Sequence, residues 1–217
     1  MKNAAVGLRV HSGWTALVVV SVENAGPVVL LRERPELVKT FSYKFRQPYH
    51  TAERLPFARG REFISSVNTE ARQLSYRALR AAQAESAKRG YHLTACGLLL
   101  ASGRPLPALQ NILASHALIH TADGQLFRNA LTHASARCGL PVLPLRESEL
   151  LKEAAQTLGQ PETSLLKRVT ELGKSIGSPW TQDEKYAALV AWLSLLQPKA
   201  PADTRTLRAA EIPGQAI

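Results

Sequence analysis

Two histidines, His116 and His120, stand four residues apart in a segment of helical character. Side chains at this spacing lie on one face of an α-helix, and imidazole is a common ligand of zinc and related transition metals. The pair is therefore half of a candidate metal site, with His11, His50 or Asp123 as a third ligand. The alternative is two polar residues that form local hydrogen bonds, and the glutamate of the zinc-protease motif HExxH is missing.

Arg9 and His11 suggest a second kind of chemistry. They lie two residues apart in an apolar segment that is predicted to be a β-strand, so they share one face of it. A covered arginine needs a partner. If the partner is an internal carboxylate, such as Asp123 or Glu184, Arg9 is structural. If it is a phosphate or carboxylate ligand, the planar guanidinium binds it well, and we favour this interpretation.

Further residues can complete such an anion site. Asp123 and Gly124 are predicted to begin a helix, where either free N–H groups hold an anion or Asp123 simply caps the helix. Arg128 lies on the same predicted helix and can point toward the ligand. The predicted ligand-binding residues are Arg9, His11, Gln47, Tyr49, His50, His116, His120, Asp123 and Arg128, of which His116 and His120 are also the predicted metal ligands.

The charge of the chain indicates an anionic partner. Its 217 residues include 27 Lys and Arg against 17 Asp and Glu, a formal net charge of +10. This excess favours nucleic acid, a phosphorylated small molecule or an anionic surface, although a basic protein without such a partner has the same composition. Residues 40–50, TFSYKFRQPYH, combine aromatic and basic side chains that can stack bases and hold phosphates. The alternative for this stretch is an edge strand with one buried face.

Several classes of protein are not indicated. The chain has no P-loop or dinucleotide-binding glycine pattern, and its apolar runs are too short to span a bilayer. Cys96 and Cys138 have no metal-binding spacing and are expected to be free thiols in a reducing compartment. The first residues lack the pattern of a secretory leader. We therefore expect a cytoplasmic protein with no membrane partner, and the oligomeric state is left open.

The apolar pattern predicts a single α/β domain over residues 1–197 and a loosely ordered tail over residues 198–217. Three antiparallel strands come first and are followed by alternating strands and helices, which predicts a mixed sheet with helices on both faces. The predicted strands are 5–11, 14–22, 28–34, 92–102 and 140–145. A loop covers 35–57, and the predicted helices are 60–89, 107–120, 124–138, 147–158, 162–175 and 182–196, the last opened by a capping box at 181–184.

Three segments carry a resemblance to a known family. Residues 6–20, VGLRVHSGWTALVVV, look like the first hairpin of the RuvC and YqgF branch of the ribonuclease-H-like superfamily. Residues 96–103, CGLLLASG, occupy the place of its fourth strand, and residues 183–196, DEKYAALVAWLSLL, look like its last helix. The resemblance covers most of residues 5–196 and implies a ribonuclease-H-like fold.

Active members of that branch hold two divalent metals with carboxylates on the first strand, the fourth strand and the last helix, and the metals clamp a phosphodiester. Here the first-strand position is Arg9, the fourth strand has no acid, and only Asp183 and Glu184 remain. A cationic side chain cannot ligate Mg²⁺ and repels it. The resemblance therefore implies a protein without two-metal nuclease chemistry, in which the two acids also suit a plain helix start.

These observations together predict a protein that binds a phosphate-bearing ligand or nucleic acid at a site lined by arginine and histidine. Two alternatives stay open. The first is a hydrolase with a single divalent transition metal as cofactor, held by His116 and His120. The second is a protein-interaction module in which Arg9 is paired internally.

Overall fold

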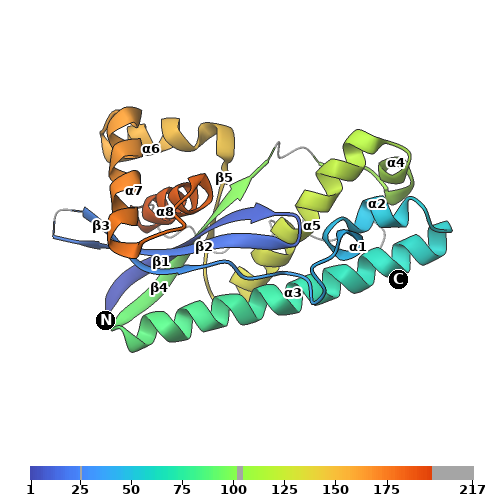
Figure 1. Ribbon diagram of the computed structural model, residues 1–217, viewed down its shortest axis with the longest axis horizontal. Helices are drawn as coiled ribbons and strands as arrows, with labels where there is room; N and C mark the ends of the chain where they lie inside the picture. The colour runs from blue at the N-terminus through green and yellow to red at the C-terminus, as the bar shows by residue number, and fades with distance from the viewer. Residues whose placement is uncertain (25, 102–104, 197–217) are drawn as a thin grey trace.

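A five-stranded mixed sheet forms the centre of the protein in the computed structural model, which describes residues 1–24, 26–101 and 105–196 (Figure 1). The strands are β1 (Lys2–His11), β2 (Trp14–Glu23), β3 (Gly26–Glu33), β4 (Tyr91–Leu100) and β5 (Val142–Arg146), in the spatial order β3-β2-β1-β4-β5. The first three strands pair antiparallel, and β4 lies parallel to both β1 and β5. The predicted fold class, with three antiparallel strands first, is confirmed.

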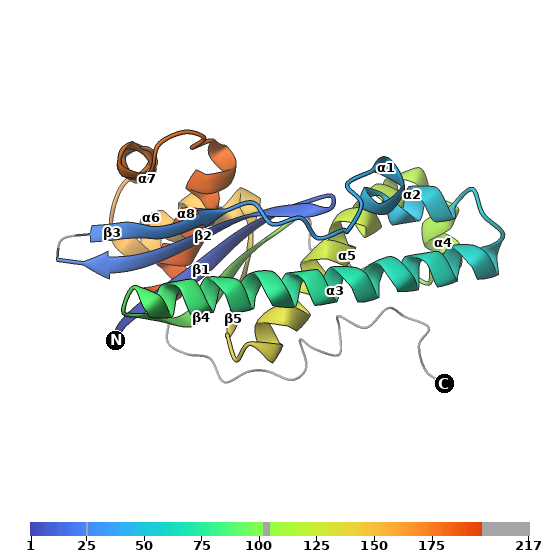
Figure 2. The same ribbon diagram turned by 60° about the horizontal axis from the view of Figure 1, so that its bottom comes forward.

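Helices cover both faces of this sheet, as Figures 1 and 2 show. The long helices α3 (Phe57–Lys88) and α5 (His116–Arg137) lie on one face, and α6 (Leu150–Leu158), α7 (Glu162–Ile176) and α8 (Gln182–Leu196) lie on the other. The short helices α1 (Tyr43–Arg46), α2 (Pro48–Ala52) and α4 (Leu109–Leu113) gather at the end of α3 and α5 that extends beyond the sheet. A single 3₁₀ turn, η1 (Glu147–Glu149), follows β5.

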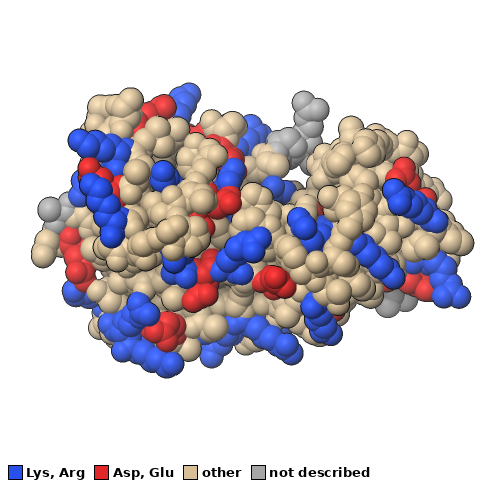
Figure 3. Space-filling model, viewed as in Figure 1, with Lys and Arg blue, Asp and Glu red and all other residues tan. Residues whose placement is uncertain are grey.

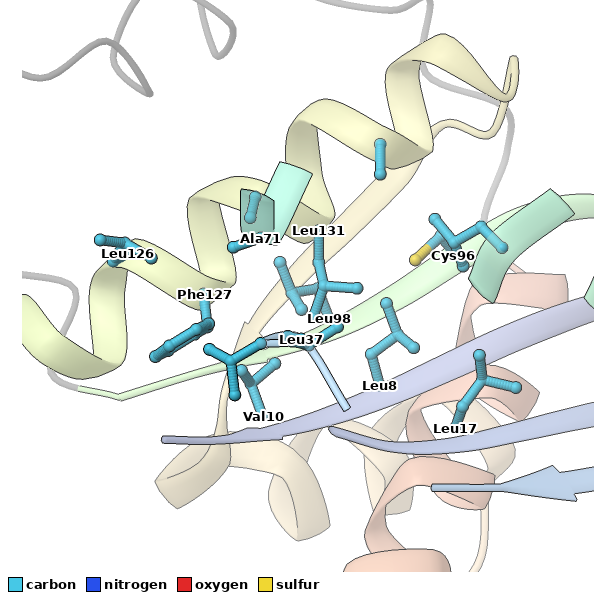
Figure 4. Close-up of a cluster of buried hydrophobic side chains, with 14 of the residues drawn as sticks. Leu8, Val10, Leu17, Leu37, Ala71, Cys96, Leu98, Leu126, Phe127 and Leu131 are labelled. Carbon is cyan, nitrogen blue, oxygen red and sulfur yellow. The ribbon is translucent and has the colours of Figure 1, made fainter. Parts of the chain in front are cut away.

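The alternation of β1 separates two environments. Val6, Leu8 and Val10 enter the core beneath α3 and α5, where Leu8 and Val10 lie near Phe127 and Leu131 (Figure 4). The residues between them face the opposite side, toward α8. Successive side chains of a strand point to opposite faces, so the apolar residues of β1 fix the side on which its polar residues lie.

Gly7 lets α8 rest directly on the sheet. A Cβ atom at this position would lie 1.9 Å from the backbone oxygen of Ala187, and one at Gly97 on β4 would lie 2.5 Å from that of Val190. Both glycines are needed because the helix backbone occupies the space of a side chain. This contact places the first turn of α8 beside the end of β1.

The capping box at the start of α8 is confirmed. The Thr181 hydroxyl accepts a hydrogen bond from the Asp183 N–H at 3.2 Å, while the Glu184 carboxylate accepts one from the Thr181 N–H at 2.6 Å. Reciprocal bonds of this kind satisfy N–H groups that a helix start otherwise leaves free. Glu184 is thereby committed to the cap.

Two predicted boundaries between residues 105 and 140 are wrong. Residue Asp123 does not begin a helix, because α5 runs unbroken from His116 to Arg137 and Asp123 lies inside it. The short helix α4 precedes it, in place of the predicted long helix over 107–120. Burial of one face along the whole of α5 outweighs the turn signal of Asp123 and Gly124. An anion held at a helix start there is therefore excluded.

The segment over residues 35–57 differs from both predictions made for it. It contains the helices α1 and α2, and the aromatic and basic residues of 40–50 lie in a bend and these helices rather than in an edge strand. The predicted tail over 198–217 lies outside the described residues. In the described part of the chain, no helix is long and apolar enough to cross a membrane, and the two thiols are free.

The contact at Gly7 leads to a stability prediction. Replacing Gly7 with Ala should lower the free energy of unfolding by about 3 kcal/mol, because α8 must move off the sheet to make room. The measurement is urea denaturation followed by circular dichroism. Gly90→Ala is the control, since nothing lies within 4 Å of its added Cβ and only the positive φ of 84° opposes it, at about 1 kcal/mol. Equal costs for the two variants would contradict this account of the packing.

Candidate functional site

Arg9 is held by two carboxylates at the end of β1. Its Nη2 and Nε atoms contact the two carboxylate oxygens of Glu147 at 2.6 and 3.0 Å, and its Nη1 donates to Asp183. Asp183 also contacts His11 Nε2 at 2.7 Å. Glu147 directly follows β5 and Asp183 lies in the first turn of α8, so this Arg9 network joins three elements at one edge of the sheet.

Arg9 is therefore paired with carboxylates of the protein itself, which is the alternative in which its role is structural. The carboxylates differ from those expected. Glu184 caps its own helix, and Asp123 lies among the residues of the core beneath α3 and α5, on the other side of the sheet. The carboxylates that meet Arg9 are instead Glu147 and Asp183. An external anion at Arg9 would have to displace them, and that role stays a prediction.

Electrostatics favours the charged forms in this network. Burial alone would raise the pKa of Asp183, but the hydrogen bonds and charges of His11 and Arg9 outweigh it and lower the pKa below its usual 3.8. The pKa of Arg9 is raised, chiefly by the hydrogen bond to Glu147. Paired groups of opposite charge each stabilise the ionised state of the other. Arg9 thus neutralises two acids that would otherwise repel each other.

A ladder of stacked side chains leads away from this network around the tip of the β1–β2 hairpin. The His11 and Trp14 rings stack with centroids 4.2 Å apart, and the Arg34 guanidinium lies 3.9 Å from the Trp14 ring. Arg34 lies 5.8 Å and Arg46 4.5 Å from the ring of Phe41. Phe41 is therefore placed near two guanidinium groups, the geometry of cation–π contacts.

The exposed end of this ladder continues into α1. Phe41 and Tyr43 have 37% and 54% of their surface exposed, and Lys44 beside them is exposed as well. Arg46 is fixed in place because its Nε donates to the Ser12 carbonyl at 3.0 Å. We call this set, Arg34, Phe41, Tyr43, Lys44 and Arg46, the basic-aromatic surface. Figure 3 shows further basic groups around the junction of the hairpin with α1 and α3.

A second group of polar residues lies where α2 meets the start of α5, at the end of the helices that extends beyond the sheet. His50 from α2 meets His116 and His120 from α5, and we call these three the histidine cluster. Their ring centroids are 4.4 Å apart for His50 and His120, 4.5 Å for His116 and His120, and 5.3 Å for His50 and His116. One nitrogen from each ring lies within 4.8 Å of the other two. Of the three expected third partners, His50 joins the pair directly.

Asp123 orients this cluster from behind. One of its carboxylate oxygens contacts His50 Nδ1 at 2.5 Å, and the other accepts a hydrogen bond from the Tyr49 N–H at 2.7 Å. Burial raises the pKa of the Asp123 carboxyl, and the hydrogen bonds from His50 and Tyr49 oppose that rise. Burial and then the charge of Asp123 raise the pKa of the Tyr49 hydroxyl to about 12.

The predicted residues therefore form two groups rather than one pocket. Arg9 and His11 face α8, whereas the histidine cluster packs on the core beneath α3 and α5. Arg128 is half-buried on α5, where burial lowers its pKa and the charge of Glu147 opposes the effect, and it joins neither group through a hydrogen bond or ion pair among the described residues. Gln47 separates α1 from α2, and its side chain does not cap α2.

Two residues of these groups were missed from the sequence. Glu147 was assigned only to a helix, and Trp14 only to a strand. The only signal for Glu147 is its place directly after the last strand, where the ends of parallel strands gather. No local pattern indicates the stacking of Arg34 on Trp14, because it depends on how the chain turns after β3.

Comparisons with known proteins found likenesses of structure only. No family model matches the chain, and the search of curated proteins gave no significant match. RuvC of Thermus thermophilus in complex with a Holliday junction substrate is 15% identical, with a TM-score of 0.49 over 89% of this chain and 93% of that one. The yeast mitochondrial Holliday junction resolvase Ydc2 is 11% identical, with a TM-score of 0.45 over 86% and 76%. The sheet order and strand directions described above are those of a ribonuclease-H-like fold, as the resemblance implied.

The Arg9 network should make stability depend on acid pH. Because the folded pKa of Asp183 is lowered, its stabilisation is present above about pH 4 and is lost as pH falls through the folded pKa. Asp183→Asn should therefore cost about 2 kcal/mol at pH 7, and the gap from wild type should shrink below pH 4. Urea denaturation over a pH series measures both values.

Glu149→Gln is the matched control for this experiment. Glu149 pairs with Arg146 at 3.2 Å in an exposed i,i+3 arrangement, so its loss should cost less than about 0.5 kcal/mol. A gap between Asp183→Asn and wild type that stays constant down to pH 3 would show that Asp183 does not act through its charge.

Proposed function

We propose that the protein binds single-stranded nucleic acid through the basic-aromatic surface and does not cleave it by two-metal chemistry. The observation that carries this proposal is the exposed ring of Phe41 beside the guanidinium groups of Arg34 and Arg46. Single strands are bound by grooves that combine aromatic rings for the bases with cations for the phosphates. Phe41 and its neighbours provide both within one segment of chain.

The charges of this surface are available to a ligand. Among the described residues, Arg34, Lys44 and Arg46 form no ion pair with a carboxylate. Arg46 is held through its Nε, which leaves the terminal nitrogens of its guanidinium for a phosphate. The net charge of +10 adds a long-range attraction for a polyanion.

Single strands suit this surface better than a duplex. An aromatic ring stacks on a base only where the base is not already stacked in a helix. Tyr43 is more exposed than Phe41 and follows it by two residues, so the two rings can serve successive bases. A small phosphorylated molecule would use only one ring and one or two of the cations.

The Arg9 network supports the absence of two-metal catalysis. Two-metal sites place carboxylates around ions that clamp the reacting oxygens. Here Glu147 and Asp183 direct their oxygens at a guanidinium instead of at a cation site. The role of Arg9 is then to hold β1, β5 and α8 together next to the binding surface.

A hydrolase with a single metal ion is a second candidate function. The observation in its favour is the convergence of His50, His116 and His120, with one nitrogen from each ring within 4.8 Å of the others. Its first requirement is a bound metal ion, which can be tested without any substrate.

Fluorescence anisotropy with labelled single-stranded and duplex DNA over a salt series tests the nucleic-acid proposal. We expect tighter binding of the single strand, and Phe41→Ala should weaken it by about 1–3 kcal/mol, or roughly 5- to 150-fold. The double variant Arg34→Gln, Arg46→Gln should flatten the slope of log K against log salt by about 1.4. Phe57→Ala and the pair Arg77→Gln, Lys152→Gln are controls with an exposed ring and exposed cations elsewhere.

Two results would overturn this proposal. One is equal loss of affinity in the control variants, which would make binding a property of the overall charge. The other is tight binding of a small phosphorylated nucleoside that Phe41→Ala does not weaken. Circular dichroism of each variant confirms the fold before either result is interpreted.

A change at Arg9 tests the claim about metals. Arg9→Asp would place a third carboxylate beside Glu147 and Asp183, and oxygen ligands of this kind bind Mn²⁺. We expect Mn²⁺ to raise the melting temperature of Arg9→Asp and to leave that of wild type and Arg9→Ala unchanged. A clear Mn²⁺-dependent rise in wild type that persists when His116 and His120 are both replaced with Ala would show that Arg9 does not exclude the ion.

A further inference from the structure

We propose that His50, His116 and His120 bind one transition-metal ion, with zinc as the best match, and that Asp123 is the positioning residue of this site. The proposal does not rest on nucleic-acid binding. It names the metal that the second candidate function, a hydrolase with a single metal ion, would require. Measurements of metal binding alone are enough to test it.

The fold brings the ligands to one place along α5. His116, His120 and Asp123 occupy positions i, i+4 and i+7 of one unbroken helix, a spacing that puts them on a single face. His50 comes from α2, which packs against that face through the Tyr49 N–H bonded to Asp123. The unbroken course of α5 is essential, since a helix break at Asp123 would turn the residues apart.

The distances suit a metal ion. His116 Nε2 and His120 Nε2 are 3.1 Å apart, and a tetrahedral ion with bonds of about 2.0–2.1 Å separates its ligand nitrogens by about 3.4 Å. The three ring planes are inclined to one another by 68°, 79° and 89°. Rings in this arrangement do not stack, and small rotations suffice to direct one nitrogen of each at a common point.

Asp123 selects the ring nitrogen that His50 offers. Because Nδ1 of His50 contacts the Asp123 carboxylate, Nδ1 carries the proton and the lone pair is on Nε2. A carboxylate behind a histidine in this way is the usual second partner in zinc sites, where it fixes the ring and raises its basicity. Asp123 is itself only 2% exposed. Its buried carboxylate is compensated by the contact with His50 and by the hydrogen bond from the Tyr49 N–H.

The donor set indicates the class of metal. Three imidazoles suit Zn²⁺, Cu²⁺, Ni²⁺ and Fe²⁺, whereas Mg²⁺ and Ca²⁺ prefer oxygen ligands. His50 is buried, while His116 and His120 are exposed. Solvent can therefore reach the ion, and a water molecule or an anion can take the fourth position, as in zinc sites that keep an open coordination place.

The site adjoins the basic-aromatic surface. The Tyr43 ring lies 6.3 Å from the His50 ring in an edge-on arrangement. A phosphate bound beside Tyr43 would therefore lie near the ion. This last step alone rests on the nucleic-acid proposal, under which a phosphate oxygen is the anionic ligand that we expect at the open position.

Titration of chelator-treated protein with Co²⁺ tests the site, because a four-coordinate Co²⁺ ion absorbs visible light strongly. We expect wild type to bind one ion with such a spectrum, and Zn²⁺ to displace it. The double variant His116→Ala, His120→Ala should lose the absorption, and Asp123→Asn should weaken binding about 10- to 100-fold. The matched control is His92→Ala, His133→Ala, which removes two histidines outside the cluster and should bind as wild type does.

The outcomes separate this proposal from the nucleic-acid proposal. His116 and His120 are exposed, so their double variant should fold, and its melting temperature without metal should equal that of wild type. Excess Zn²⁺ should raise the melting temperature of wild type but not of this variant. No Co²⁺ binding by wild type, or equal binding by the double variant, overturns the metal site whatever the anisotropy measurements show.

Discussion

The contact of α8 with β1 determines where the other groups of the protein lie. Because Gly7 admits the backbone of Ala187, the start of α8 reaches the end of β1 and brings Asp183 to Arg9. Arg9 then joins this helix to Glu147 at the end of β5. Without the guanidinium, two half-buried carboxylates would face each other. The free energy of unfolding would then fall by more than the ion pairs themselves contribute to it. The positive charge of Arg9 therefore neutralises the two carboxylates at this edge of the sheet, as a bound cation would otherwise have to.

The segment between β3 and α3 supplies both proposed sites. Its first part gives Phe41, Tyr43 and Arg46 to the basic-aromatic surface, and α2 gives His50 to the histidine cluster. The segment is held at both ends, since Arg46 bonds to Ser12 in the hairpin and the Tyr49 N–H bonds to Asp123 in α5. It thus links the edge of the sheet to the helical end of the molecule, and the Tyr43 ring lies 6.3 Å from the His50 ring between the two proposed sites.

The sequence predicted the sheet well because strand signals are local. Alternation in residues 5–11 and apolar runs in 14–22 and 92–102 gave the strands and the class of fold. It also predicted that His116 and His120 share a face, since that follows from helical spacing. It failed where distant segments decide. The residues at Asp123 and Gly124 indicated a helix start, but burial of one face of α5 keeps that helix unbroken. The partners of Arg9 lie 138 and 174 residues away in sequence, so no local pattern could choose Glu147 and Asp183 over Asp123 and Glu184.

The separation of Arg9 from the histidine cluster explains how one chain can carry two sites of different chemistry. The Arg9 network consists of ionised groups, and its oxygens are the ligands that hard cations prefer. The histidine cluster offers nitrogen, which suits softer transition metals. The histidine cluster lies where α2 meets the start of α5, beyond the sheet, whereas Arg9 faces α8, so different elements hold the two groups. The pairing of Glu147 and Asp183 with Arg9 beside α8 therefore does not preclude metal binding by the imidazoles of α2 and α5, because the two groups depend on different elements and different donor atoms.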